Sequence, residues 1–213
     1  MDEDARGGSH VLAGSVHEDE SFDGADLSGE QLENSHFLRC SLRGVLLSSA
    51  TTTGCTFEEC DFTDARLNGS EHRRSSFVGC TFKGASLFSG VFSGCRLIGA
   101  SLEETDLTAL TLSGGDLAYA NLFEKENLKG QDLRGIRFVE AELAGCDLSG
   151  ADLRDADLTR ANLSRARLRG ADLRAACLDG VDLSALDLGG VKLDVGQAVL
   201  LARCRGAEVD LEG

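Results

Sequence analysis

The sequence contains no proline and no tryptophan, and it has one tyrosine and ten phenylalanines among its 213 residues. An α/β domain of this size usually carries several prolines in its loops, so their absence indicates few loops or turns built in another way. No stretch approaches the roughly 20 apolar residues that a membrane helix needs. The start, Met1-Asp2-Glu3-Asp4, is acidic, whereas a secretory signal is basic and then apolar. We therefore expect a cytoplasmic protein without a membrane segment.

Signatures of catalysis and metal binding are equally scarce. The chain has four His residues and lacks a G-x-S-x-G, a P-loop and an H-E-x-x-H motif. Its eight Cys residues include no C-x-x-C pair, and in a cytoplasmic protein we expect them to be reduced. A reduced Cys behaves as a small buried apolar residue. We therefore expect no enzyme, no metal site and no cofactor.

The dominant pattern is a Leu or Phe at every fifth position. It runs from Phe22 to Leu193, except for polar residues at Thr52 and His72 and a shift of one residue within 123–127. The residue two positions earlier is small, and the residue between is usually Asp, Asn, Ser or Thr. A period of five fits neither an α-helix nor a flat strand. It fits a coil in which each pentapeptide forms one side and one corner, with the small residue and the Leu/Phe pointing inward.

The clearest copies lie in Ala151–Leu173, which reads A-D-L-R-D-A-D-L-T-R-A-N-L-S-R-A-R-L-R-G-A-D-L. This pattern resembles the pentapeptide-repeat family over most of the chain. The resemblance implies an all-β fold, a right-handed quadrilateral β-helix, with four sides closing a coil of about 20 residues. About nine such coils, stacked at roughly 4.8 Å, would form a rod about 40 Å long. We expect an acidic N-terminal tail at 1–16, the β-helix at 17–193, and a capping and dimerisation segment at 194–213.

A coil of about 20 residues predicts which side chains stack. Cys40, Cys60 and Cys80 should form one inward column, and Phe37, Phe57 and Phe77 another. Thr52 and His72 should lie on the same side of adjacent coils, where we expect a bulge; it is either a recognition patch or a tolerated irregularity. The shift at 123–127 adds one residue to a side. It is either a functional kink or a neutral insertion.

The C-terminal segment predicts a helix. Asp194 can cap it with Gln197 as the capping-box partner, and Gly206 can end it, with a short strand at 208–212 to follow. The helix is apolar on two sides. One side can cap the open end of the rod, and the other can meet a second copy in a two-fold dimer, unless a monomer buries both. The expected interface residues are Val195, Ala198, Val199, Leu200, Leu201 and Ala202.

The outward positions are strongly acidic, with 36 Asp and Glu against 21 Lys and Arg. Such a surface repels nucleic acid and attracts basic partners, although the charge could serve solubility alone. In the C-terminal half, columns of Asp and Arg should neutralise each other; they comprise Asp132, Asp152, Asp172, Arg134, Arg154 and Arg174. The acids expected to face a partner are Asp106, Asp116, Glu142, Asp147, Asp157, Asp182 and Asp187.

Within the family, two segments resemble the branch of MfpA and the quinolone-resistance (Qnr) proteins. They are Ser70–Cys80 (S-E-H-R-R-S-S-F-V-G-C) and Gly190–Leu201 (G-V-K-L-D-V-G-Q-A-V-L-L). The shift at 123–127 departs from the MfpA pattern. The resemblance implies a rod-like homodimer that imitates B-form DNA and binds DNA gyrase, with topoisomerase IV as a further candidate. Such binding would inhibit the enzyme or protect it from fluoroquinolones and other gyrase poisons. The alternative is a scaffolding repeat protein with an unrelated basic partner.

Overall fold

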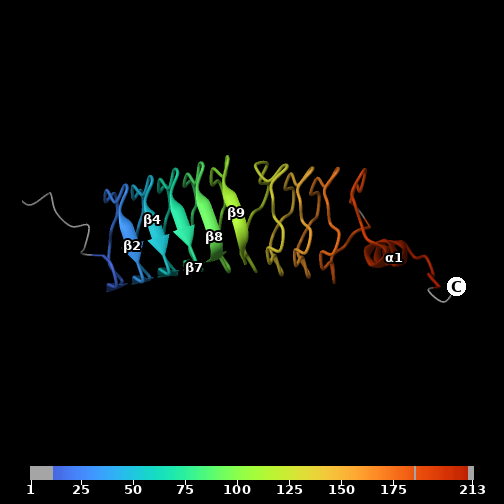
Figure 1. The fold of residues 1–213 in the computed structure, drawn as a ribbon, viewed down its shortest axis with the longest axis horizontal. Helices are drawn as coiled ribbons and strands as arrows, with labels where there is room; N and C mark the ends of the chain where they lie inside the picture. The colour runs from blue at the N-terminus through green and yellow to red at the C-terminus, as the bar shows by residue number, and fades with distance from the viewer. Residues whose placement is uncertain (1–11, 185, 211–213) are drawn as a thin grey trace, which may run out of the picture.

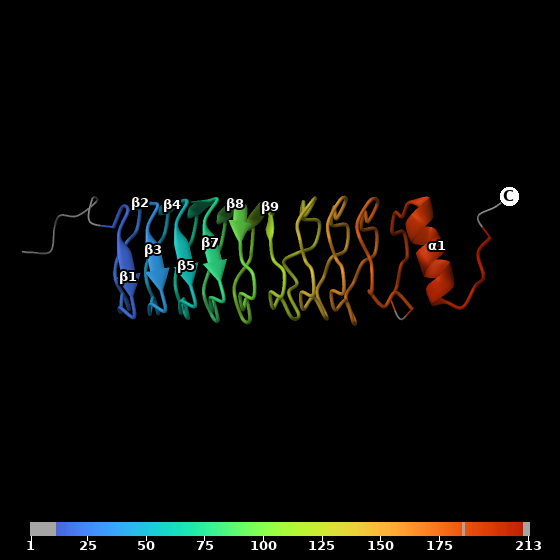
Figure 2. The ribbon, with the colours of Figure 1, turned by 90° about the horizontal axis from the view of Figure 1, so that it is seen from below.

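The protein is a right-handed quadrilateral β-helix with a helix packed at its C-terminal end (Figure 1). The computed structural model describes residues 12–184 and 186–210. Its elements are β1 (Val16–Glu18), β2 (Gln31–Glu33), β3 (His36–Leu38), β4 (Thr51–Thr53), β5 (Thr56–Glu58), β6 (Glu71–Arg73), β7 (Ser76–Val78), β8 (Val91–Arg96), β9 (Thr111–Asp116) and α1 (Val195–Cys204). The coils stack along one axis, and α1 lies across the last of them (Figure 2).

Each coil has four faces, which we name by their inward residues in one coil: face A (Leu42), face B (Leu47), face C (Thr52) and face D (Phe57). Strands β2, β4, β6, β8 and β9 form face C, and β1, β3, β5 and β7 form face D. All strand pairs are parallel. Faces A and B are joined by isolated bridges instead, such as Ser41 to Asp61. The expected 20-residue register is therefore confirmed in the N-terminal half.

The core consists of the inward Leu, Phe and small side chains, as the repeat predicts. Phe37 and Phe57 stack with ring centroids 4.8 Å apart, and Phe57 and Phe77 follow at 5.0 Å with nearly parallel planes. Cys40 and its two counterparts in the column, Cys60 and Cys80, are buried. Each coil buries its side chains against its neighbours only, so stability accumulates along the stack.

The bulge expected at Thr52 and His72 is absent, and that prediction is wrong. The two residues are direct partners in the pairing of β4 with β6, and both side chains are buried. Thr52 Oγ1 lies 2.8 Å from His72 Nδ1, while Ser70 Oγ lies 2.8 Å from His72 Nε2. Because each buried polar atom finds a polar partner in the column, the backbone keeps its regular path.

The shift at 123–127 lengthens one coil by a single residue. Ser101 pairs with Asn121 at the usual spacing of 20, whereas Asn121 pairs with Glu142 and Asp116 with Arg137 at a spacing of 21. Lys125 takes the inward position of a small residue and is buried, and its Nζ donates a hydrogen bond of 2.9 Å to the Thr105 carbonyl.

The two ends of the rod differ from the expected boundaries in small ways. The capping box of α1 is confirmed: Gln197 N donates to Asp194 Oδ1 at 2.9 Å, and Asp194 N donates to Gln197 Oε1 at 3.0 Å. Residues 208–210 form no strand, so that part of the expected 208–212 strand is wrong, and 211–212 lie outside the described residues. Of the expected tail at 1–16, residues 1–11 also lie outside them. The β-helix starts earlier than predicted, since β1 begins at Val16 and Leu12 already packs against the core.

Candidate functional site

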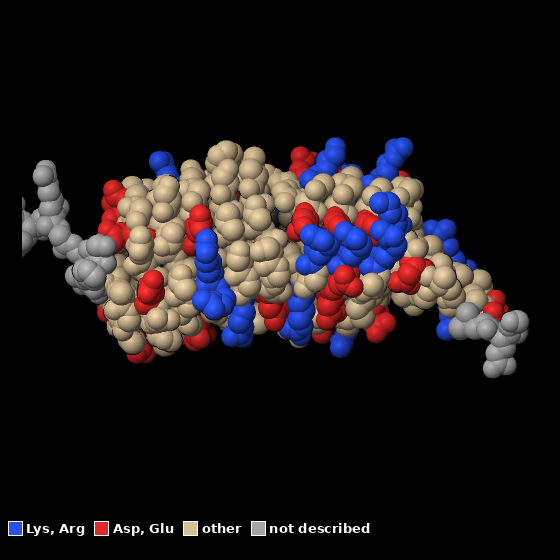
Figure 3. Space-filling model, in the orientation of Figure 1, with Lys and Arg blue, Asp and Glu red and all other residues tan. Residues whose placement is uncertain are grey.

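Face C carries a ladder of ion pairs in the C-terminal half of the rod. Arg134 Nε and Nη2 donate to the two carboxylate oxygens of Asp132 at 2.7 and 2.6 Å. The same bidentate pair recurs in the next coils at Arg154 with Asp152 and at Arg174 with Asp172. Hydrogen bonding from Arg134 lowers the pKa of Asp132 to about 2. Figure 3 shows the ladder as a row of acidic side chains beside a row of basic ones, and its charges compensate each other, as the sequence predicts.

Three of the seven predicted partner-facing acids are also compensated. Arg137 Nη1 lies 2.7 Å from an oxygen of Asp116, and its Nε lies 3.9 Å from Asp157. Arg167 Nη2 lies 3.2 Å from Asp147. These acids therefore add little net negative potential to their faces.

The other four predicted acids have polar partners and form no ion pair among the described residues, although the buried Lys125 ammonium attracts Asp106 from a longer distance. Hydrogen bonds from Thr108 lower the pKa of Asp106, and hydrogen bonds from Ser184 lower the pKa of Asp182. Within the described chain, no Lys, Arg or His nitrogen lies within 4 Å of the carboxylates of Asp106, Glu142, Asp182 or Asp187.

A fifth acid with the same environment, Glu103, was missed by the sequence analysis. Its Oε1 accepts a hydrogen bond of 2.8 Å from Asn121 Nδ2 in the next coil, just as Glu142 accepts bonds of 2.9 and 3.0 Å from Asn162 Nδ2. The amide orients the carboxylate without neutralising it, while the buried Lys125 ammonium attracts Glu103 from a longer distance. The sequence offered one sign of this role for Glu103, namely Asn121 in the next coil.

We call these five residues the acidic stripe. Its members lie at outward positions on the adjoining faces A and B; they are Glu103, Asp106, Glu142, Asp182 and Asp187. Because backbone amides, hydroxyls and side-chain amides fix several of these carboxylates, the stripe is a preorganised array of negative charge.

The C-terminal helix provides the second candidate surface. Its buried Gln197 donates through Nε2 to the carbonyls of Leu173 and Ala176, the latter at 2.8 Å. Of the six predicted interface residues, Leu200 and Leu201 pack against the end of the core, whereas Val195 is 78% exposed. The remaining three, Ala198, Val199 and Ala202, are exposed or half-buried. One side of α1 thus caps the rod, and the other faces outward.

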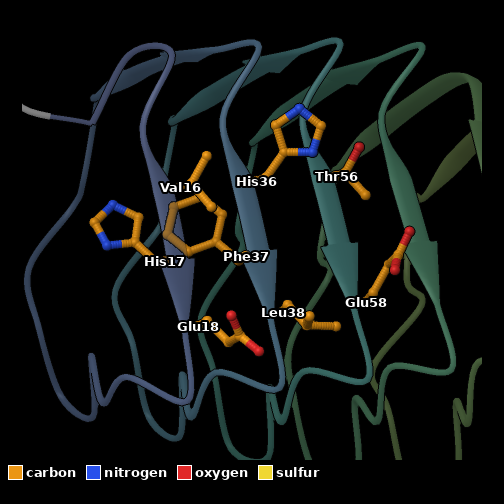
Figure 4. Close-up of a pocket in the computed structure, with 8 residues that line it drawn as sticks. All are labelled: Val16, His17, Glu18, His36, Phe37, Leu38, Thr56 and Glu58. Carbon is orange, nitrogen blue, oxygen red and sulfur yellow. The ribbon is translucent and has the colours of Figure 1, made fainter.

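A shallow hollow of about 380 Å³ lies on face D near the N-terminal end (Figure 4). Val16, His36 and Thr56 form one outward row over it, and Glu18, Leu38 and Glu58 form a second. In the described part of the chain, no group of three His, Cys, Asp or Glu side chains is placed to hold a metal ion. None of the described helices is long and apolar enough to cross a membrane.

A comparison with known protein families identifies the repeat. The sequence profile of the family described as pentapeptide repeats matches residues 40–71, 60–87, 91–123, 127–160 and 146–184. No curated protein sequence matches the chain significantly.

Among solved structures, full-length QnrB1, a plasmid-mediated fluoroquinolone resistance protein, is similar at 26% identity and a TM-score of 0.83. That match covers 92% of this chain and 99% of QnrB1. A trypsin-treated variant of QnrB1 aligns at 28% identity and a TM-score of 0.84, over 95% of this chain and all of the other. With the repeat profile matching most of its length, this chain belongs to the pentapeptide-repeat family.

Proposed function

We propose that this protein binds DNA gyrase in place of a DNA segment, and thereby inhibits the enzyme or protects it from fluoroquinolones or other gyrase poisons. Topoisomerase IV is a second candidate partner. The observation that carries the proposal is the similarity to QnrB1 along nearly the whole of both chains. The acidic stripe supplies a surface of the charge that such binding requires.

The electrostatics support this proposal. Duplex DNA carries about one negative charge per 1.7 Å of its axis, and proteins hold it through Lys and Arg. The chain has a formal net charge of −15. Coils about 4.8 Å apart present its carboxylates at fixed positions along one axis. A basic groove that accepts DNA can therefore attract the rod, and the attraction should weaken with salt.

We further propose that two copies join through the outward side of α1. Val195 is 78% exposed, and Ala198 beside it is also exposed, while Leu200 and Leu201 remain against the rod. A two-fold axis at this end would place two rods end to end and double the length of the acidic surface. The interface would then consist chiefly of Val195, Ala198, Val199 and Ala202.

The test is direct binding of purified gyrase to the immobilised protein at increasing salt. The informative variant neutralises the acidic stripe by Glu→Gln and Asp→Asn changes. A matched control removes the same number of charges from exposed, ion-paired acids, namely Glu18, Asp19, Glu71, Asp132 and Glu140. We expect the stripe variant to lose gyrase binding and the control to retain most of it. Absence of binding by the unaltered protein to a cognate gyrase would refute the proposal.

A further inference from the structure

The backbone ladder is interrupted between β9 and the coil that follows it. On faces A and D the two coils remain joined, for example from Leu102 N to Asn121 O at 2.9 Å and from Leu117 N to Arg137 O at 2.7 Å. On faces B and C, residues 107–114 make no backbone hydrogen bond to residues 126–135, both segments lying within the described chain. The interruption coincides with the 21-residue coil. The extra residue therefore separates two coils on one side while the opposite side holds.

Among the residues that the structure describes, side-chain hydrogen bonds cross the gap on face B only. Lys125 Nζ reaches the Thr105 carbonyl, and Asn127 Nδ2 donates to Thr108 Oγ1 at 2.8 Å. On face C the gap is an open crevice of about 460 Å³, with 111–114 of β9 on one wall and 132–135 on the other. This volume lies within the range of protein ligand sites. Leucines of the core lie beneath it.

The walls of the crevice present backbone groups that are paired in regular coils. In a regular coil, the N–H groups of the inward residue and of the residue two positions later donate to carbonyls of the next coil. For example, Leu97 N donates to Asp116 O at 2.7 Å, and Gly99 N donates to Ala118 O at 2.9 Å. The equivalent donors on β9 are the N–H groups of Leu112 and Gly114. The equivalent acceptors on the opposite wall are the carbonyls of Asp132 and Arg134. Regular coils also have a reverse bond, as from Thr111 N to Gly90 O at 2.9 Å, and its equivalent here would join Asp132 N–H to the Leu110 carbonyl. Each wall therefore offers both donors and acceptors at strand spacing.

The charged residues that line the crevice, Asp132, Arg134 and Asp155, carry one excess negative charge, and Arg154 lies near Asp155. Asp132 and Arg134 compensate each other through their bidentate pair. Asp155 also lines the crevice, and within the described chain no cationic nitrogen lies within 4 Å of its carboxylate. A Cβ at Gly114 or at Gly135 would meet no atom within 4 Å, so there is room for the side chains of an occupant.

We propose that this crevice receives one extended segment of a protein partner, which pairs with the free edge of β9 as an added strand and places a Lys or Arg beside Asp155. An extended polypeptide alternates N–H and C=O groups along both edges, so it can satisfy both walls at once. The joint retained on faces A and D serves as the axis about which the coils open to admit it. The site is separate from the acidic stripe, and the proposal does not depend on gyrase binding.

The test uses the full chain and a fluorescent peptide about eight residues long, in which valine alternates with lysine to favour an extended, cationic strand. We expect saturable binding by anisotropy, with slowed hydrogen exchange at the amides of Leu112 and Gly114. A peptide of the same sequence with alternate backbone nitrogens methylated has one blocked edge and cannot pair with both walls, so it should bind at least tenfold more weakly. Equal binding of the two peptides would show that charge alone holds the peptide, without backbone pairing, and would overturn the proposal.

Two variants locate the binding. Deletion of Glu126 together with Lys125→Ala restores the small–Asn–Leu order and a 20-residue coil, which should close the crevice and weaken peptide binding at least tenfold. Asp155→Asn should weaken it several-fold, whereas Asp179→Asn, which removes one carboxylate away from the crevice, should not. Peptide binding unchanged by the deletion, or self-association of the chain through this edge, would contradict the assignment. The methylated peptide keeps the test decisive if the deletion variant folds poorly.

Discussion

Thr52 Oγ1 lies 2.8 Å from His72 Nδ1 inside the rod, in a column whose neighbouring members are Leu32 and Phe92. The imidazole is fully buried, and burial lowers the pKa of His72 to about 3. The ring is therefore neutral and serves as a hydrogen-bonded core residue. Ser70 and Thr52 occupy its two nitrogens.

This burial predicts a loss of stability in acid. In the unfolded chain a His titrates near pH 6.5, whereas in the folded chain His72 stays neutral until about pH 3. Its contribution is therefore fully present above about pH 6.5 and is lost as the pH falls towards 3. The loss reaches at most about 5 kcal/mol, from roughly 1.4 kcal/mol for each unit of pKa difference.

The comparison is between the unaltered protein and His72→Leu, measured as the free energy of unfolding in urea between pH 7.5 and 4. In the variant, Thr52 keeps Ser75 as a partner at 2.9 Å, and Ser70 keeps the Leu67 carbonyl at 2.7 Å. We expect the variant to lose less stability on acidification than the unaltered protein. Parallel curves would show that His72 does not titrate across this range.

Restoring the regular frame should stabilise the rod. Deletion of Glu126 with Lys125→Ala leaves Ala-Asn-Leu in the repeat order, so the missing backbone bonds on faces B and C can form. A net gain of about 0.5–1 kcal/mol for each of several bonds predicts about 3 kcal/mol. The free energy of unfolding measures it, with Lys125→Ala alone as the control for the buried lysine. A lower stability of the deletion variant would mean that the extra residue does not cause the interruption.

Gln197 should hold the helix to the rod. Its side-chain amide satisfies the carbonyls of Leu173 and Ala176 at the open end of the last coil. In Gln197→Leu these buried acceptors lose their donor, which typically costs about 1–3 kcal/mol. We expect faster proteolysis within 195–210 and a lower unfolding midpoint. Cys204→Ser, at the exposed end of α1 and outside the proposed dimer interface, is the control and should behave as the unaltered protein.

The proposed dimer predicts a charge-sensitive contact at the start of α1. Val195→Asp places a carboxylate at an exposed position in the first turn, where it favours the isolated helix. We expect light scattering to show a dimer for the unaltered protein. At the same concentration the variant should be a monomer, because its association is weakened. Ala207→Asp, beyond the end of α1, should leave the dimer intact. A monomeric unaltered protein would contradict the proposed interface.

The fold was predictable because nearly every pentapeptide repeats the same pattern of residue types. Small residue, polar residue and Leu or Phe at fixed spacing leave one way to bury the apolar side chains, and the columns of Cys40 and Phe37 follow from the 20-residue coil. At Thr52 and His72 the sequence led to the wrong prediction of a bulge, because polar residues at inward positions were taken to be exposed. Two polar residues one coil apart can instead satisfy each other inside the core.

The charged surface was less predictable, since it depends on which side chains meet across coils. Arg167 lies one regular coil after Asp147, so their pairing could have been read from the spacing. Arg137 meets Asp116 only because the coil between them has 21 residues, and a strict period of 20 does not align them. The crevice beside β9 has no motif of its own; it results from the bonds that the extra residue prevents.

The acidic stripe should act collectively. Several carboxylates spread over two faces share the attraction to a basic surface, so a single reversal such as Asp182→Lys should weaken gyrase binding by less than about tenfold. Reversal of all five members should abolish it, as measured by the same direct binding. Loss of binding on reversal of Asp182 alone would instead indicate one dominant contact.

The most direct test of the central claim is a gyrase supercoiling assay with the purified protein, run at two salt concentrations with and without a fluoroquinolone. We predict inhibition of supercoiling, or rescue of the drug-poisoned enzyme, at low salt and a weaker effect at high salt, because the stripe competes with DNA through screened charges. The neutralised stripe variant should have lost the effect. No effect of the unaltered protein on a cognate gyrase at either salt concentration would contradict the account.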